Sequence, residues 1–211
     1  YSSRSRLANI RTHYDLIVVG GGIYGAALLW EAARRGLSAI LLERGDYAGG
    51  ASANSLKIIH GGIRYLQQLD IPRIRSSARE QRFFLSKMPH LVKPLECMSP
   101  CHGLGLKSRG AYQMAFWSYA ALSADIRKRA MDAGTSLPKG SILSPSVLRK
   151  NFPGLQRQRS NGTARWFDAI ALDTERVVLA LIVEACQCGA QAFNYAEMSA
   201  FLTKGSRVVG I

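Results

Sequence analysis

The residues best suited to chemistry gather near the amino terminus, in a glycine-rich stretch followed by one acid. Gly20, Gly22 and Gly25 have G-x-G-x-x-G spacing. Glycine at these places permits a tight turn, a close approach of a pyrophosphate to the backbone, and close packing of a helix on a strand. Glu43 follows about 20 residues later, where an acid can accept hydrogen bonds from an adenosine ribose. The pattern predicts a dinucleotide-binding site.

The elements that must position these residues form a β-α-β unit. Residues 16–19 are apolar and typical of a buried parallel strand, residues 26–35 are expected to be a helix that Gly36 ends, and residues 37–42 a second strand. The helix N-terminus would offer unpaired N–H groups and a positive dipole to phosphates. The alternative is a structural turn in an ordinary β-α-β unit. The unit alone does not distinguish FAD from a nicotinamide cofactor.

The charge of the chain indicates an anionic partner. Its 211 residues carry a formal net charge of +14, and the basic excess is concentrated in residues 57–93 and 107–165. A phosphorylated substrate, anionic lipid headgroups and nucleic acid are the candidates. Nucleic acid is disfavoured, because the basic residues are spread among apolar helical stretches and no nucleic-acid-binding signature is present. An acidic remainder of a longer protein would be an alternative way to balance the charge.

The cysteines and the apolar stretches exclude some classes of protein. The four cysteines have no metal-ligand spacing and are expected to be buried, reduced thiols in a cytosolic protein rather than disulfide or zinc ligands. They are Cys97, Cys101, Cys186 and Cys188. The longest uncharged stretch, residues 16–30, contains several glycines and is shorter than the ~20 residues of a membrane span. Contact with a membrane is therefore expected to be peripheral only.

The rest of the chain is expected to alternate loops, helices and strands. The long, small and polar loop 44–55 is expected to be functional, and the segment around Pro94 and Pro100 to leave the nucleotide-binding layer. The other expected elements are a flexible arm at 1–13, helices at 73–87, 112–131 and 145–151, a strand at 164–172, a helix at 174–188 capped by Asp173, a third sheet strand at 191–195, and a hairpin over 197–211. Because the chain ends on an apolar strand, we interpret it as the amino-terminal part of a longer protein.

Several stretches together resemble the FAD-dependent glycerol-3-phosphate dehydrogenases, within the glycine oxidase and D-amino-acid oxidase class of flavoproteins. The residues that carry the resemblance are the glycine turn with Glu43, KIIHGGIRYL at 57–66, PHLVKPL at 89–95, and the aspartate-containing segments 166–168 and 173–178. The resemblance extends from Asp15 to the end and is looser over residues 98–162. The run at 57–66 is its most specific part.

The resemblance implies an α/β fold in two domains. A Rossmann-like FAD-binding domain, with a parallel sheet and a β-hairpin or meander, would comprise residues 1–94 and, after an excursion, 173–211. Residues 95–172 would form part of a second, α+β substrate domain. The chain would be a fragment, with a later flavin-binding strand, further phosphate-binding arginines and the proton acceptor beyond it.

The resemblance also implies which residues form the site. The FAD pyrophosphate and adenosine would be held by Gly20, Gly21, Gly22, Ile23, Gly25, Glu43 and Arg44. The residues beside the isoalloxazine ring would be Ser52, Ser55, Lys57, His60, Gly61 and Gly62. Arg64 and Tyr65 match substrate-pocket positions, where a guanidinium and a phenol suit a phosphate. The alternatives are a surface ion pair for Arg64, a core position for Tyr65 and a packing role for His60. No metal site is expected, and no catalytic residue is assigned.

The implied reaction oxidises glycerol 3-phosphate to dihydroxyacetone phosphate, with hydride passing to flavin N5 and electrons then passing to a membrane quinone. The protein would be cytoplasmic, with peripheral contact at the inner face of the cytoplasmic membrane, and a homo-oligomer is left open. This chain alone is expected to be inactive. The alternatives are an amine or 2-hydroxy-acid oxidase of the same fold, and a non-catalytic basic module that binds anionic lipid or nucleic acid.

Overall fold

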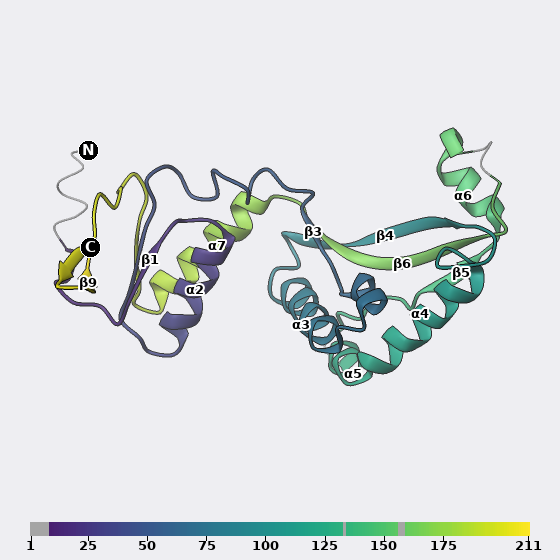
Figure 1. The fold of residues 1–211 in the computed structure, drawn as a ribbon, viewed down its shortest axis with the longest axis horizontal. Coiled ribbons are helices and arrows are strands. Elements are labelled where there is room, and N and C mark those ends of the chain that lie inside the picture. Colours follow the sequence, from purple (N-terminus) through teal and green to yellow (C-terminus); the bar gives the residue numbers. More distant parts are fainter. Residues whose placement is uncertain (1–8, 133, 156–158) are drawn as a thin grey trace. The chain divides into compact units, whose positions relative to one another are not determined.

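The chain forms two compact units. The computed structural model describes residues 9–132, 134–155 and 159–211. The first unit combines the amino-terminal residues up to Leu56 with Asp173–Ile211, and the second comprises Lys57–Leu172 (Figure 1). Each unit is described below by itself.

A parallel sheet organises the first unit. Its elements are β1 (Leu16–Val19), α2 (Ile23–Arg34), β2 (Ala39–Leu42), α7 (Thr174–Gln187) and β7 (Gln191–Phe193). The strands pair in the order β1-β2-β7, all parallel. The predicted β-α-β unit and the predicted third strand are therefore confirmed. Helix α2 begins three residues earlier than expected, because Gly22 is already its N-cap.

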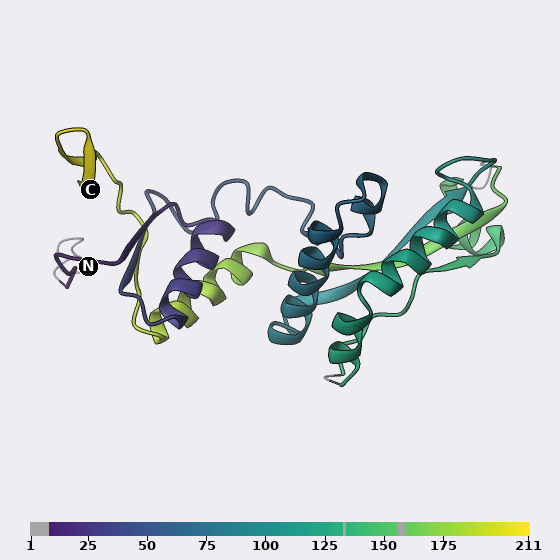
Figure 2. The same cartoon turned by 60° about the horizontal axis from the view of Figure 1, so that its bottom comes forward.

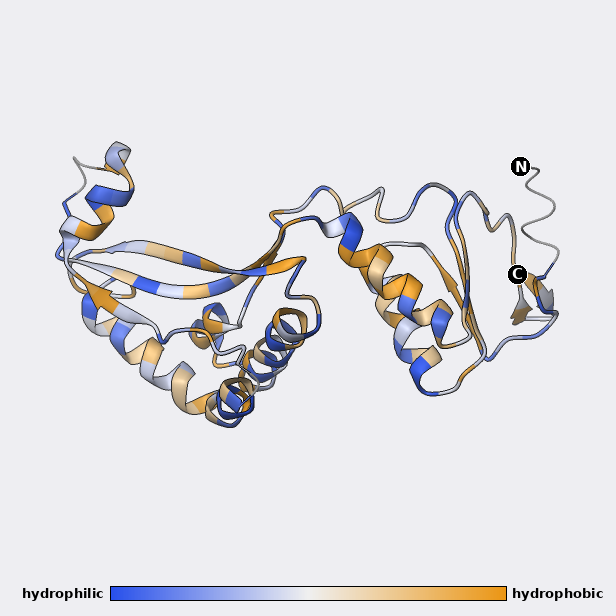
Figure 3. Ribbon diagram, turned by 180° about the vertical axis from the view of Figure 1, so that it is seen from behind, coloured by the Kyte–Doolittle hydropathy of each residue, from blue (hydrophilic) through white to orange (hydrophobic). Residues whose placement is uncertain are grey.

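Two helices cover this sheet and supply its core. The buried cluster combines residues of β1, β2, α2 and α7, including Val18, Leu29, Leu41 and Ala185. Figure 3 shows the apolar residues that run along α7. Leu29 is completely buried, and burial of a leucine side chain contributes about 1.5–3 kcal/mol.

The start of α7 follows the predicted capping pattern. The Arg176 N–H donates to Oδ1 of Asp173 at 3.0 Å, and Gly189 follows the helix with φ +94°. A capping carboxylate satisfies one of the N–H groups that a helix start leaves without a partner.

Replacing Asp173 by alanine should destabilise the first unit by about 1 kcal/mol, since loss of a capping side chain typically costs about 0.5–2 kcal/mol. The measurement is the midpoint of chemical denaturation, followed by circular dichroism. Asp173→Asn is the matched control and should retain most of the stability, because asparagine caps about as well. Equal loss in both variants would contradict a capping role.

The carboxyl-terminal residues form a hairpin, as predicted. Strands β8 (Leu202–Lys204) and β9 (Arg207–Gly210) pair antiparallel, with Gly205 at φ +62° in the turn. The first strand is shorter than expected, since residues 197–201 are not part of it.

A long antiparallel ribbon organises the second unit. Its elements are β3 (Ile58–Ile59), η1 (Ile63–Gln68), α3 (Ile71–Lys87), β4 (Val92–Cys101), α4 (Arg109–Leu122), α5 (Ala124–Asp132), β5 (Ser141–Leu143), α6 (Pro145–Asn151), η2 (Pro153–Leu155) and β6 (Gly162–Ala171). The sheet has the order β3-β6-β4, and β5 also pairs with β6. Figures 1 and 2 show α3, α4 and α5 along one side of the β4–β6 ribbon.

The proline-containing segment is a strand, which the sequence did not indicate. Pro94 lies opposite Ala169, and Pro100 opposite Thr163, in β4. Proline is tolerated there because β4 pairs with β6 alone among the described strands, and an edge strand does not need every N–H.

The expected helix over residues 112–131 is wrong, because α4 and α5 are separate helices. The chain leaves helical geometry at Ser123, with φ −110° and ψ +14°. The Ser123 hydroxyl donates to the carbonyl oxygen of Tyr119 at 2.6 Å. A serine hydroxyl that bonds the carbonyl four residues back competes with the helix and bends it.

The compact units divide the chain differently from the expected domains. Residues 57–94 pack with residues 95–172, because β3 and β4 both pair with β6. The expected boundary after residue 94 is therefore not a boundary between compact units. Which of these residues contact a cofactor stays a prediction.

The expectation for the cysteines holds in part. All four are free thiols. Cys101 is buried and Cys97 half-buried, but Cys186 and Cys188 are exposed, so the expected burial is wrong for that pair, which lies at the end of α7. No group of histidine, cysteine or acidic residues that could hold a metal occurs in the described part of the chain. Within the same residues, no helix has the length and apolar character to cross a membrane.

Candidate functional site

The glycine turn between β1 and α2 requires two of its glycines. Gly20 has φ +109°, where an L side chain is strained. A Cβ on Gly25 would lie 1.9 Å from the carbonyl oxygen of Gly20. Gly22 is the N-cap of α2 and, being glycine, has no side chain of its own to cap the helix. The helix start thus has the backbone geometry of a phosphate-binding turn.

Glu43 fixes this turn from the end of β2. The Gly21 N–H donates to Oε2 of Glu43, and the Gly45 N–H donates to Oε1, each at 2.7 Å. These two hydrogen bonds, that from Gly21 first, hold the pKa of the Glu43 carboxyl below its usual range. A carboxylate oxygen can accept more than one hydrogen bond, so the predicted contact with a ribose stays a prediction. The sequence did not indicate that Glu43 would also stabilise the glycine turn.

The long loop 44–55 folds back on the turn. The Ile23 N–H donates to the Ser52 hydroxyl oxygen at 2.9 Å, and the Ala48 N–H donates to the carbonyl oxygen of Gly21 at 2.9 Å. Ser52 thus binds the first N–H of α2. The predicted contacts of Ser52 and Ser55 with a flavin ring stay predictions.

A cleft of about 290 Å³ opens at the carboxyl ends of β1 and β2. Its lining residues are Val19, Gly20, Leu42, Glu43, Arg44, Ala196, Glu197 and Met198. Ligands of open α/β sheets bind outside the carboxyl ends of the strands, and the cleft lies at this place, while its binding of an adenosine stays a prediction. Residues 196–198 were not among the expected site residues. Their position after the third parallel strand is the signal that could have indicated them.

The glycine pair in the second unit packs against helices. A Cβ on Gly62, which has φ +96°, would lie 2.8 Å from the carbonyl oxygen of Ile74. A Cβ on Gly61 would lie 2.8 Å from Oε1 of Gln81 and from the Tyr119 hydroxyl. The backbone at this glycine pair therefore lies close to α3 and α4, and its predicted place beside a flavin ring stays a prediction.

Asp168 of β6 holds the histidine–glycine segment in place. Its Oδ1 accepts from the Gly61 N–H at 2.8 Å, and its Oδ2 lies 3.1 Å from Nδ1 of His60. Nε2 of Gln81 donates to the Ile59 carbonyl oxygen at 3.0 Å and lies 3.4 Å from Oδ1 of Asp168. Asp168 is only 4% exposed. His60 therefore interacts with a buried carboxylate, and its role is not limited to packing.

Sequence reasoning did not assign Asp168 to the site. The available signal is its place as the sole acid in the strand 164–172, where Arg165 is the only other charged residue, because a buried carboxylate in a sheet needs partners.

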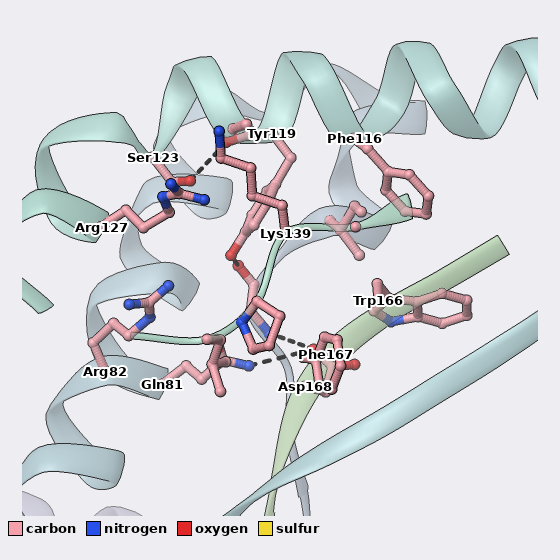
Figure 4. Close-up of a pocket in the computed structure, with 16 residues that line it drawn as sticks. Gln81, Arg82, Phe116, Tyr119, Ser123, Arg127, Lys139, Trp166, Phe167 and Asp168 are labelled. Atoms are coloured by element: carbon pink, nitrogen blue, oxygen red, sulfur yellow. Dashed lines mark hydrogen bonds between the residues drawn. The ribbon is translucent and has the colours of Figure 1, made fainter. Parts of the chain in front are cut away.

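Tyr119 completes this network from α4. Its hydroxyl donates to the carbonyl oxygen of Gly61 at 2.7 Å, and burial raises its pKa to about 12. The phenol is therefore a neutral hydrogen-bond donor at physiological pH. Figure 4 shows Tyr119, Gln81 and Asp168 beside a cavity of about 40 Å³.

Arg64 and Tyr65 lie on η1 and contact each other. Cζ of Arg64 is 5.5 Å from the centre of the Tyr65 ring, and Cζ of Arg73 is 4.4 Å from it. Arg64 is exposed and Tyr65 half-buried. In the described part of the chain, Arg64 has no ion pair, so the ion-pair alternative has no support. Arg64 also lines an open, largely apolar groove of about 650 Å³.

The predicted site residues thus form two groups, one within each unit. Gly20, Glu43 and Ser52 lie together around the start of α2, and His60 and Gly61 lie together around Asp168. Lys57 precedes the second group with φ +58°, and its carbonyl oxygen accepts from the Ala171 N–H. A shared site of both groups stays a prediction.

Comparison with known proteins relates the chain to flavoenzymes. The model of the family described as FAD dependent oxidoreductase matches residues 15–211. A glycerol-3-phosphate dehydrogenase of Synechocystis sp. is 34% identical over 92% of this chain and 33% of its own length. The mitochondrial glycerol-3-phosphate dehydrogenase of Homo sapiens is 32% identical over 92% of this chain and 26% of its own length. The chain therefore spans about a third or less of these relatives.

Solved structures share the fold. The glycerol-3-phosphate dehydrogenase from Bacillus halodurans, in complex with FAD, aligns over 98% of this chain and 31% of its own, with TM-score 0.64 and 22% identity. L-Proline dehydrogenase from P. horikoshii aligns over 94% of this chain and 48% of its own, with TM-score 0.66 and 17% identity. The predicted α/β fold with a Rossmann-like unit is confirmed. With its glycine turn, its acid at the end of β2 and a family match over nearly its whole length, the chain belongs to the FAD dependent oxidoreductases.

Proposed function

We propose that this chain provides the pyrophosphate- and adenosine-binding part of an enzyme that oxidises sn-glycerol 3-phosphate to dihydroxyacetone phosphate. The observation that carries the proposal is the start of α2. Its N-cap is Gly22, and the N–H groups on either side, those of Gly21 and Ile23, donate to Glu43 and Ser52. The names of the relatives at 32–34% identity support the substrate.

The chain's own residues bind and position. The N–H groups at the start of α2 would hold the FAD pyrophosphate, and the Glu43 carboxylate, kept ionised by its two amide donors, would accept from the ribose. Asp168 and Tyr119 would fix the His60–Gly61 backbone beside the flavin ring. Arg64 and Tyr65 would bind the substrate phosphate. FAD, when bound, would supply the redox chemistry as the acceptor of hydride from the substrate. No residue of this chain is assigned as the proton acceptor.

The proposed electron acceptor is a membrane quinone, reached by peripheral contact at the inner face of the cytoplasmic membrane. The net charge of +14 supports this, because basic residues near a membrane surface are attracted to anionic lipids.

The experiment that tests the function is the absorption spectrum of the full-length protein that contains this chain, recorded before and after anaerobic addition of glycerol 3-phosphate. We expect a flavin band that bleaches with glycerol 3-phosphate and not with glycerol. Bleaching by an amine or a 2-hydroxy acid, without dependence on phosphate, would instead indicate an oxidase of the same fold. A colourless protein that gains no flavin band with added FAD would indicate a non-catalytic binding module.

Replacing Arg64 by glutamine should raise KM for glycerol 3-phosphate by roughly 10- to 100-fold in the full-length enzyme, because a hydrogen bond to a charged group contributes about 1.5–3 kcal/mol. Steady-state kinetics measures this. Arg73→Gln is the matched control, since Arg73 also contacts the Tyr65 ring and is not assigned to the substrate. An equal rise of KM in both variants would show that Arg64 acts only by supporting Tyr65.

A further inference from the structure

Three basic side chains converge on the small cavity of the second unit. Arg82 comes from α3, Arg127 from α5, and Lys139 from the segment before β5, and all three line the cavity of about 40 Å³. Figure 4 shows them gathered at the end of the cavity away from Trp166. A single water needs roughly 10–15 Å³ of such space. The cavity therefore has room for a group of several heavy atoms.

The guanidinium of Arg82 lacks an acceptor. Its Nη1 atom is buried and, among the residues that the structure describes, none accepts a hydrogen bond from it. Burial first, and the neighbouring charge of Arg127, lower the pKa of Arg82, while Tyr119 opposes this. A buried donor without an acceptor is unfavourable. An anion in the cavity would accept a hydrogen bond from Nη1 of Arg82. It would also offset the electrostatic repulsion between Arg82 and Arg127.

The acid that lines the cavity is already engaged, and so is one acid of α5. Asp168, the only acid among the lining residues, accepts from the Gly61 N–H and lies beside His60. On α5, Asp125 binds Arg75 through two hydrogen bonds of 2.8 and 2.9 Å. Within the described residues, Arg82, Arg127 and Lys139 are in no salt bridge. The described lining of the cavity thus carries three basic side chains and one carboxylate, which is already bound to Gly61 and His60.

We propose that this cavity binds a small tetrahedral oxyanion, of the phosphate class, between Arg82, Arg127 and Lys139. Two guanidinium groups can each donate a pair of hydrogen bonds to such an ion, and an ammonium adds a point charge. The site uses no side chain that is assigned to FAD or to the substrate. Since Gly61 and Asp168 form one wall of the cavity, a bound anion would also stabilise the segment that they hold.

The test is the thermal unfolding of the full-length protein that contains this chain, prepared without flavin, in sodium phosphate and in sodium chloride of equal pH and ionic strength. A ligand that binds only the folded state raises the unfolding temperature in a concentration-dependent way. We expect phosphate to raise the unfolding temperature of the wild type above its value in chloride. Isothermal titration calorimetry with inorganic phosphate should then give a dissociation constant that rises at least 10-fold in Arg82→Gln and in Arg127→Gln.

Neighbouring cations on the same helices provide matched controls. Arg79→Gln on α3 and Lys128→Gln on α5 remove the same charge from exposed positions that do not line the cavity and should keep the phosphate response. Lys139→Gln, outside the helices, serves as a second variant should Arg82→Gln fail to fold. A phosphate effect of equal size in all variants, or none in the wild type, would overturn the proposal.

A further comparison separates free phosphate from the substrate. Glycerol 3-phosphate should compete with inorganic phosphate in the wild type and in Arg64→Gln alike, because both ligands carry the same anionic group. Dependence of phosphate binding on Arg64 rather than on Arg82 would assign it to the substrate pocket and overturn the proposal. Because no flavin is present, the outcome is independent of the proposed enzymatic activity.

Discussion

Replacing Gly25 by alanine is expected to weaken FAD binding by at least roughly 100-fold, because two charge-assisted hydrogen bonds of about 1.5–3 kcal/mol each would be lost. The added Cβ would lie 1.9 Å from the carbonyl oxygen of Gly20, a backbone atom that cannot move aside by a side-chain rotation. The turn must open to relieve this overlap. The N–H groups at the start of α2 would then move away from the pyrophosphate. Quenching of FAD fluorescence on titration with protein measures the change.

Gly50 provides the matched control for this prediction. It lies in the loop that folds over the turn, and a Cβ built there meets nothing within 4 Å. Gly50→Ala should therefore bind FAD as the wild type does. FAD affinity of Gly25→Ala within a factor of two of the wild type would show that the pyrophosphate does not lie at this turn. Circular dichroism of both variants separates loss of binding from loss of the fold.

The first unit could be predicted from the sequence because its signals are local. Its signals lie in neighbouring residues, as hydrophobic periodicity or as helix-capping residues. This holds for the strand at 16–19, the glycine turn and the capped helix at 174–187. The pairing of β7 with β2 joins residues far apart in the chain, yet a buried strand after a capped helix has few other places in a parallel sheet.

The second unit was harder to predict because long-range pairing decides it. Pro94 and Pro100 argue against a strand locally, and only the pairing of β4 with β6 makes them acceptable. The break at Ser123 lies between two segments of helical sequence and depends on one hydroxyl. Neither feature has a signal within a short window of sequence.

The candidate site likewise has a part with local sequence signals and a part that depends on long-range contacts. The glycine spacing identified the turn, and the acid at the end of β2 followed from its distance along the chain. The hydrogen bond from Gly61 to Asp168 joins residues more than a hundred positions apart. The cluster of Arg82, Arg127 and Lys139 likewise comes from three separate elements. Such convergence is a property of the tertiary fold and leaves no spacing pattern.

Replacing Asp168 by alanine is expected to destabilise the second unit by about 3–5 kcal/mol, the range found when a buried ionic or hydrogen-bonded partner is removed. The Gly61 N–H would lose its acceptor, and His60 and Gln81 would lose their common neighbour. Asp168 itself is only 4% exposed. Chemical denaturation followed by tryptophan fluorescence measures the loss, because Trp166 lies two residues away on the same strand.

Two further substitutions separate the hydrogen bonds of Asp168 from its charge and from general effects on the ribbon. Asp168→Asn keeps one carbonyl oxygen for the Gly61 N–H but brings an amide donor toward His60 or Gln81, so it should lose roughly half as much as alanine, or about 2 kcal/mol. Glu96→Ala, on the neighbouring strand, removes a surface ion pair with Arg165 at 3.6 Å and should change stability by less than about 1 kcal/mol. If Asp168→Ala were no more destabilising than Glu96→Ala, the His60–Gly61 segment would owe its position to the packing of Ile74 and Tyr119 rather than to the carboxylate.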